Sequence, residues 1–177
     1  MAAFSELDWT RFDVHALAAN AGVAVVERAL RDACHAWLAR NGYVIDTIDF
    51  GAGIGGAAVT LGALLRWEGQ FGYALSESRA NLDALRDGFV FDPPAGARGR
   101  VLELLNADTA YREDPAWLLD LLAIAAEHSR HQLALGVRFF TVLSLPQGSV
   151  LEGVRFESRA VPFPFRSSSR TGDPFDR

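Results

Sequence analysis

The stretch DPAWLLDLLAIAAEHSRHQLALGVRFFTVLSL, residues 114–145, joins a helix signal directly to a strand signal. Asp114 suits the N-cap of a helix, and Pro115 suits the first helical position because a backbone N–H is not needed there. We expect this helix to run to about Leu135. The following segment, Val137–Leu145, is strongly apolar, which is typical of a strand covered on both faces. A long helix that leads into a buried strand predicts an α/β fold.

The same alternation extends towards the N-terminus. In chain order we expect a strand over 43–50, a helix over 57–67, a short helix within 79–89 and a strand over 99–106. FDPPAGARG (91–99) and ADTAYRED (107–114) are predicted to be loops. Strands separated by helices imply a parallel sheet with right-handed crossovers. The predicted central domain, 43–145, is therefore a small three-stranded parallel sheet flanked by helices.

Two extensions lie outside this domain, at 1–42 and 146–177. In VAVVERALRDACHAWLARNG (23–42), apolar residues recur at helical spacing, which predicts an extra N-terminal helix that ends at Asn41-Gly42. Cys34 falls on the apolar stripe, so we expect a packed thiol and not a nucleophile. After Leu145 the periodicity is lost, and RSSSRTGDPFDR (166–177) has the composition of a disordered tail.

The composition excludes several classes of protein. The chain has 177 residues, of which 50% are hydrophobic, with a net charge of −5 and a pI near 5.3. The acidic balance argues against direct nucleic-acid binding through a basic surface and is compatible with a basic protein partner. With Cys34 as its single cysteine the chain forms no internal disulfide, so a reducing compartment is expected. Neither a secretory signal nor a membrane span is evident, and we predict a cytoplasmic protein. The oligomeric state stays open.

The glycine-rich segment GAGIGG (51–56), between the strand at 43–50 and the next helix, matches a dinucleotide-binding fingerprint. A flavin- or nicotinamide-binding enzyme is therefore an alternative reading. Such a site needs a second strand soon after the helix, ending in an acid that binds the ribose. The segment EGQFGYALSESRA (68–80) that follows contains turn and polar residues and no apolar strand. A flexible glycine turn is the preferred interpretation.

Other catalytic or metal-binding patterns are weak. His128 and His131 are three residues apart on the long helix next to Glu127, but a zinc site needs further ligands at suitable positions. No serine lies in a nucleophile elbow, and no phosphate-binding loop is present. The sequence therefore predicts neither a cofactor nor a metal, and a protein that is not an enzyme.

The short helix within RANLDALRDGF (79–89) has an unusual acidic side. Leu82, Leu85 and Phe89 share a core-facing stripe at about 100° per residue. Asp83 and Asp87 point together on nearly the opposite side, where the two carboxylates repel each other. Either this face is simply solvated, or the two charges serve an interaction.

The stretch Asn81-Leu82-Asp83-Ala84-Leu85, followed by Asp87, resembles the second-helix signature of the barstar family, small inhibitors of microbial ribonucleases. Three more segments are similar to the family in the right order: Phe71-Gly72 before the signature, Val101-Leu102-Glu103 in its middle strand and Phe139–Ser144 in its last strand. The resemblance covers roughly 43–145. It implies a barstar-like fold and a protein that plugs the cationic active site of a nuclease, with its carboxylates in place of substrate phosphates.

Carried over to this chain, the resemblance implies a partner-binding surface made by Asp83 and Asp87, with Asn81 at its start, Tyr73 and Arg86 beside it, and Glu127 as a further acidic contact. Two features depart from the family. Arg86 stands where family members often carry an aromatic residue, and the segment 73–80 is longer than its counterpart. We therefore expect a basic toxin other than the family's best-known nuclease, for which this chain is the bacterial immunity protein. A regulatory protein-binding module on the same scaffold is a further alternative.

Overall fold

The computed structural model describes residues 11–19, 22–75, 82–91, 93–156, 159–160 and 175. Within them the main sheet has four parallel strands in the order β1-β4-β3-β2. These strands are β1 (Val23–Glu27), β2 (Tyr43–Asp49), β3 (Gly99–Leu105) and β4 (Arg138–Leu145). The predicted α/β class is confirmed, but the prediction of three strands is wrong.

The additional strand comes from the segment predicted to begin the N-terminal helix. Val23–Glu27 forms β1, which pairs in parallel with β4 at the edge of the sheet. Its residues Val23 to Val26 are buried on both faces, which explains why their apolar pattern also fitted a helix. The helix α2 (Arg31–Arg40) starts only after a 3-10 turn, η3 (Arg28–Leu30). The predicted N-terminal extension therefore supplies part of the common sheet.

Most of the remaining elements follow the prediction. In α7 (Pro115–Ala134) the Asp114 side chain accepts a hydrogen bond from the Trp117 N–H at 3.0 Å, and every residue of β4 is buried. The helix α3 (Gly53–Leu64) begins earlier than expected. The segment predicted to be a loop after β3 instead forms α6 (Ala107–Glu113), because Ala107 and Ala110 pack into the core.

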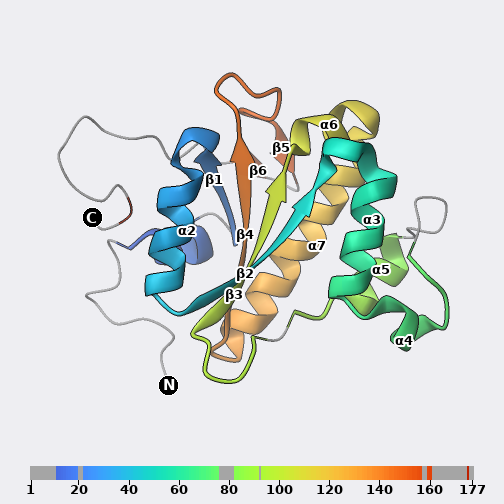
Figure 1. The fold of residues 1–177 in the computed structure, drawn as a ribbon, viewed down its shortest axis with the longest axis horizontal. Helices are drawn as coiled ribbons and strands as arrows, with labels where there is room; N and C mark the ends of the chain where they lie inside the picture. The colour runs from blue at the N-terminus through green and yellow to red at the C-terminus, as the bar shows by residue number, and fades with distance from the viewer. Residues whose placement is uncertain are drawn as a thin grey trace.

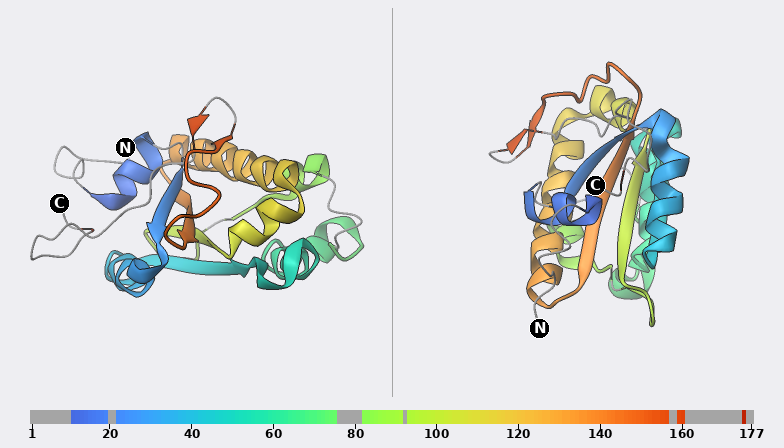
Figure 2. Two further views of the ribbon diagram at one scale, coloured as in Figure 1. Left: turned by 90° about the horizontal axis from the view of Figure 1, so that it is seen from above. Right: turned by 90° about the vertical axis from the view of Figure 1, so that its left-hand side faces the viewer.

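The two faces of the sheet carry separate cores. Leu102, Leu104 and Phe139 face the core that contains residues of α3, α6, α7 and α5 (Leu82–Gly88). The opposite face packs against α2 and against α1 (Phe12–Val14) and η2 (His15–Ala19). Figures 1 and 2 show α7 along one side of the strands and α2 on the other. The crossover from β1 to β2 passes over the face covered by α2. The crossovers from β2 to β3 and from β3 to β4 pass over the opposite face and run across the sheet in the opposite direction. All three crossovers therefore have the same hand.

After β4 the chain turns between 147 and 153 and forms a short antiparallel pair, β5 (Arg155–Phe156) and β6 (Arg159–Ala160). Phe175 lies buried in the core on the α2 side, where its ring centroid is 5.1 Å from that of Phe12. The other residues of the predicted disordered tail lie outside the described residues. In the described part of the chain, no helix combines the length and apolar character needed to cross a membrane.

Candidate functional site

The helix α5 presents its two aspartates to solvent, as its sequence predicts. Leu85 and Phe89 are buried against the core, and Gly88 lies over the rings of Phe71 and Trp67. Asp83 and Asp87 are both exposed, and the Asp83 side chain retains 91% of its accessible surface. The packing of one face therefore fixes the helix and leaves the acidic face free of the core.

Arg86 connects this acidic face to the long helix α7. Its Nε donates to Glu127 Oε2 at 3.2 Å, and its Nη1 lies 3.7 Å from Asp83 Oδ1. All three side chains are at least partly exposed, so the ion pairs contribute little to stability. They do affect the distribution of charge on this surface, because the contact with Glu127 holds the positive charge of Arg86 on the side that faces α7. Among the described residues, Asp87 has no ion-pair partner.

A small hollow of about 80 Å³ lies between α5 and α7, lined by Arg86, Phe89, Ile124, Glu127, His128 and His131. His128 is committed to the fold, because its Nε2 accepts the Phe91 N–H at 3.4 Å and its ring contacts Phe139 edge-on. His131 is exposed. Within the described ranges, no group of three or more His, Cys, Asp or Glu side chains is arranged to hold a metal ion.

An aromatic cluster supports the same region. Tyr73 follows α4 (Trp67–Phe71), and its ring lies 6.1 Å from that of Trp67 and 6.2 Å from that of Phe71. Since Gly88 of α5 rests on Trp67 and Phe71, the structure brings Tyr73 near the end of the acidic helix. Asn81, the remaining predicted contact, lies outside the described residues. The structure thus gathers Asp83, Arg86, Asp87, Tyr73 and Glu127 into one region of the molecule.

The glycine-rich segment is already occupied by a side chain of the protein itself. At the start of α3, the Ile54 N–H donates to Glu113 Oε2 at 2.9 Å. In a dinucleotide-binding site, the helix N-terminus would face an anionic phosphate. Here a carboxylate from the end of α6 takes that position. Gly53 is needed for the backbone, because its φ is +81°.

Open α/β sheets usually bind ligands at the carboxyl ends of their strands. In this protein, hydrogen bonds between side chains connect those ends. Asp49 Oδ1 accepts from Asn106 Nδ2 at 2.6 Å and from the Gly51 N–H at 2.8 Å. Arg28 Nη2 donates to Asn106 Oδ1 at 2.8 Å. The hydrogen bond from Asn106, followed by that from Gly51, lowers the pKa of Asp49. These contacts connect the segments that follow β1, β2 and β3.

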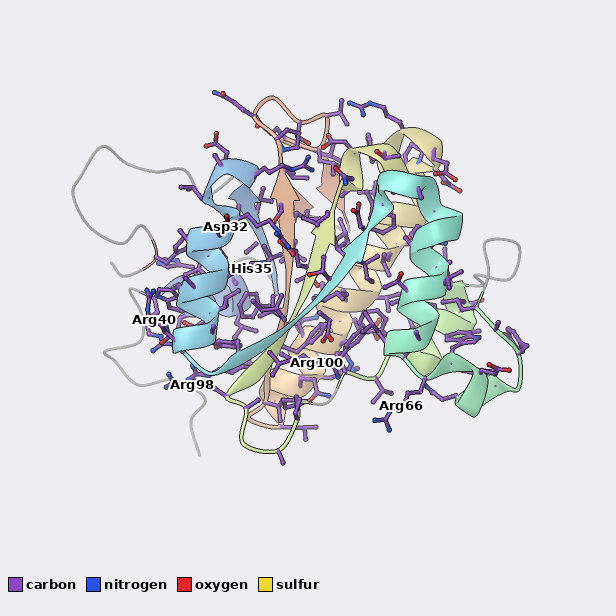
Figure 3. The ribbon with its side chains drawn as sticks, in the orientation of Figure 1. Asp32, His35, Arg40, Arg66, Arg98 and Arg100 are labelled. Atoms are coloured by element: carbon purple, nitrogen blue, oxygen red, sulfur yellow. The ribbon has the colours of Figure 1, made fainter. Side chains whose placement is uncertain are left out.

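Sequence reasoning missed a buried carboxylate in the middle strand. Glu103 is only 1% exposed and lies on the α2 side of β3. Arg31 binds both of its oxygens at 2.8 Å, His35 Nε2 lies 3.0 Å away, and the hydroxyls of Thr47 and Ser144 donate to it. Figure 3 places His35 on the side of α2 that faces the strands. An acidic residue inside the apolar run VLELL was the available signal.

The Glu103 cluster is a structural anchor. Burial alone would raise the pKa of Glu103, but hydrogen bonds from Arg31, Ser144 and Thr47 outweigh it and hold the value at about 2. The carboxylate is therefore ionised at neutral pH and saturated with donors, which leaves it unsuited to exchange protons. Next to His35, the thiol of Cys34 is buried in the core, in agreement with the predicted packing role.

A second buried carboxylate holds the N-terminal segment. Asp13 accepts from Arg11 Nε at 3.0 Å, from Arg138 Nη1 at 3.0 Å and from the Tyr43 hydroxyl. Burial opposes ionisation of Asp13, but the contacts with Arg11 and Tyr43 lower its pKa overall. Burial, with Asp13 nearby, raises the pKa of Tyr43. This cluster fastens α1 to the amino ends of β2 and β4.

Comparison of the chain with models of protein families, with curated proteins and with solved structures finds no match.

Proposed function

We propose that this protein is a non-enzymatic, barstar-like inhibitor or immunity protein that blocks the active site of a basic toxin, with a ribonuclease as the leading candidate. The interaction surface is the α5–α7 acidic surface, defined as Asp83, Asp87 and Glu127 with Arg86 between them. Tyr73 lies beside it. The observation that carries the proposal is that Asp83 and Asp87 both face solvent from a helix whose other face is fixed in the core.

The chemistry of this surface fits a phosphate-binding cleft. A carboxylate accepts paired hydrogen bonds from an arginine, in the same way that a phosphate does. Clustered negative charges also attract a basic partner over a distance and raise the association rate. Because Glu127 engages Arg86, the positive charge of Arg86 is partly compensated beside the two aspartates. Asp87 in particular can meet a cationic group of the partner.

The other possible site, at GAGIGG, is engaged by contacts within the protein. The N-terminus of α3 already binds Glu113, and the carboxyl ends of β1, β2 and β3 are connected through Arg28, Asn106 and Asp49. These contacts disfavour the alternative of a flavin or nicotinamide enzyme built on GAGIGG.

The test begins with capture of the partner from the native cells, using the full chain as bait. We expect a basic nuclease whose cleavage of RNA stops on addition of the protein. The variant Asp83→Asn/Asp87→Asn should bind at least about 100-fold more weakly, because desolvated charge partners commonly contribute about 2–5 kcal/mol each. Its melting temperature should stay close to that of the wild type, because both side chains are exposed.

A matched control removes the same charge from the other side of the molecule. The variant Glu27→Gln/Asp32→Asn changes β1 and α2, which lie away from α5 (Figure 1). Its affinity for the partner should lie within about twofold of the wild-type value when salt screens the long-range attraction between the two proteins. Full inhibition by the Asp83/Asp87 variant would rule out the α5–α7 acidic surface as the contact. Capture of a housekeeping protein would favour a regulatory module.

A further inference from the structure

A cavity at the opposite end of the sheet from the carboxyl-end contacts has a cationic character. It has a volume of about 360 Å³ and is lined by Leu64, Leu65, Arg66, Gln70, Val90 and Arg100. This volume is in the range of small-molecule sites, roughly 300–1,000 Å³. Its polar lining is two arginines and an amide, and among the described residues no acidic side chain lines it.

Arg66 is held in a backbone conformation that favours glycine. It connects α3 to α4 with φ +52° and ψ +40°, in the left-handed region. Side chains with a Cβ rarely adopt this region, and glycine would meet no such penalty. The arginine is exposed, and no hydrogen bond or ion pair joins its side chain to another described residue. A strained backbone at the rim of a cavity is a common sign of a functional position.

Contacts with Asp46 and Phe91 help to position Arg100. Its Nε donates to Asp46 Oδ2 on β2, and its guanidinium lies 5.0 Å from the centroid of the Phe91 ring. The side chain is 18% exposed, so it is fixed within the wall of the cavity. The apolar lining comes from Leu64, the last residue of α3, from its C-cap Leu65, and from Val90, which is 47% exposed despite being apolar. The cavity therefore combines a guanidinium held in place by its ion pair with Asp46, an exposed cation at the rim and an apolar surface.

We propose that this cavity, the Arg66–Arg100 cavity, binds a small organic anion, namely a carboxylate or phosphate carried on an apolar group. A planar guanidinium recognises both anions through paired hydrogen bonds. The apolar part of the ligand would rest against Leu64, Leu65 and Val90. Figure 3 shows Arg66 at the foot of α3 and Arg100 between it and the start of the strands, whereas Arg98 lies farther away, towards Arg40 of α2. The inference does not depend on the α5–α7 acidic surface.

The experiment is an NMR titration of the ¹⁵N-labelled full chain with phenyl phosphate, benzoate and inorganic phosphate as probes. We expect saturable shifts of the amides of 64–66, 90 and 100 with phenyl phosphate or benzoate. The one that binds more tightly identifies the preferred anion. Inorganic phosphate should bind at least about tenfold more weakly than phenyl phosphate, because it lacks the apolar group.

Variants separate binding at the cavity from general attraction to positive charge. Arg66→Gly should weaken binding of the preferred probe at least about tenfold, since it removes a charge-assisted contact. Its melting temperature should equal or exceed that of the wild type, because glycine relieves the left-handed backbone. Arg98→Gln, whose side chain lies outside the lining residues, should bind within about twofold of the wild type once salt screens long-range attraction.

Three results would overturn the proposal. The first is the absence of saturable shifts at the cavity with both organic probes. The second is equal loss of binding in Arg66→Gly and Arg98→Gln, which would indicate attraction to the basic region as a whole. The third is binding of inorganic phosphate as tightly as phenyl phosphate, which would exclude a role for the apolar wall.

Discussion

Arg86 on α5 reaches Glu127 on α7, with its Nε 3.2 Å from Glu127 Oε2, across a separation of 41 residues in sequence. The pair places a positive charge between α5 and α7, within the proposed contact surface. It also gives Arg86 an acidic partner besides Asp83, whose Oδ1 lies 3.7 Å from Arg86 Nη1.

Replacement of Arg86 by glutamine should accelerate association with a basic partner several-fold, whereas Glu127→Gln should slow it. The reason is that the charge on the contact surface steers the encounter with a basic partner and so changes the association rate. Stopped-flow mixing at low and high salt measures both rates, and the difference between the variants should shrink at high salt. Slower association of Arg86→Gln at low salt would show that Arg86 itself contacts the partner.

Gly88→Ala should destabilise the fold by about 1–3 kcal/mol through overpacking. A Cβ at Gly88 would lie 2.6 Å from the Phe71 ring and 2.9 Å from the ring of buried Trp67. The control is Gly69→Ala on α4, where no atom lies within 4 Å of the new Cβ. That change should stabilise by about 0.5–1 kcal/mol through helix propensity. Urea denaturation measures both, and a Gly88→Ala variant as stable as the wild type would contradict the packing of α5 on α4.

Glu103→Gln should reduce the free energy of unfolding at neutral pH by an amount on the order of 3 kcal/mol, because the pKa of Glu103 is lowered to about 2 in the fold. A depressed carboxyl pKa stabilises the folded state fully above its unfolded value. That contribution is lost as the pH falls through the folded value. The difference between wild type and variant should therefore shrink between about pH 4.5 and pH 2. A difference that is independent of pH over this window would contradict the assignment.

Asp13→Asn should destabilise the protein by about 3–5 kcal/mol, since it deprives the buried Arg138 of its carboxylate partner. Tyr43→Phe removes only one hydroxyl donor from the same carboxylate and should cost about 1 kcal/mol. Guanidinium denaturation compares the two variants. Equal, small losses would show that residues 11–19 contribute little to folding.

Nucleotide binding offers a test of the glycine-rich segment. Because Glu113 already accepts the Ile54 N–H, FMN and NADH should leave the melting temperature of the wild-type protein unchanged. Glu113→Ala should lower the stability by about 1 kcal/mol, as expected for loss of a helix-capping carboxylate. An increase in melting temperature with either nucleotide would revive the enzyme alternative.

Local signals predicted several elements well. The Asp114-Pro115 pair marked the start of α7, and the apolar run after Gly136 marked β4. The stripe of Leu82, Leu85 and Phe89 oriented α5, so that its aspartates were correctly expected at the surface. These features depend on hydrogen bonds and side-chain spacing within one segment, which the sequence contains directly.

The errors arose where burial depends on distant partners. The apolar residues of β1 fit a helical stripe as well as a doubly covered strand, and only pairing with β4 decides between them. The polar residues of α6 suggested a loop, although Ala107 and Ala110 are buried in the core. Burial of a residue outweighs local propensity in such segments.

The α/β class, the long helix that leads into the last strand and the acidic face of α5 follow from local sequence, because each is set by residues close together in the chain. Tertiary structure alone decided that β1 joins the sheet, that Glu113 caps α3, that Glu103 gathers Arg31 and His35, and that Arg86 meets Glu127. The physical reason is that a charged side chain or an apolar strand has many possible partners far away in the sequence. Only the packed fold brings one of them within contact distance.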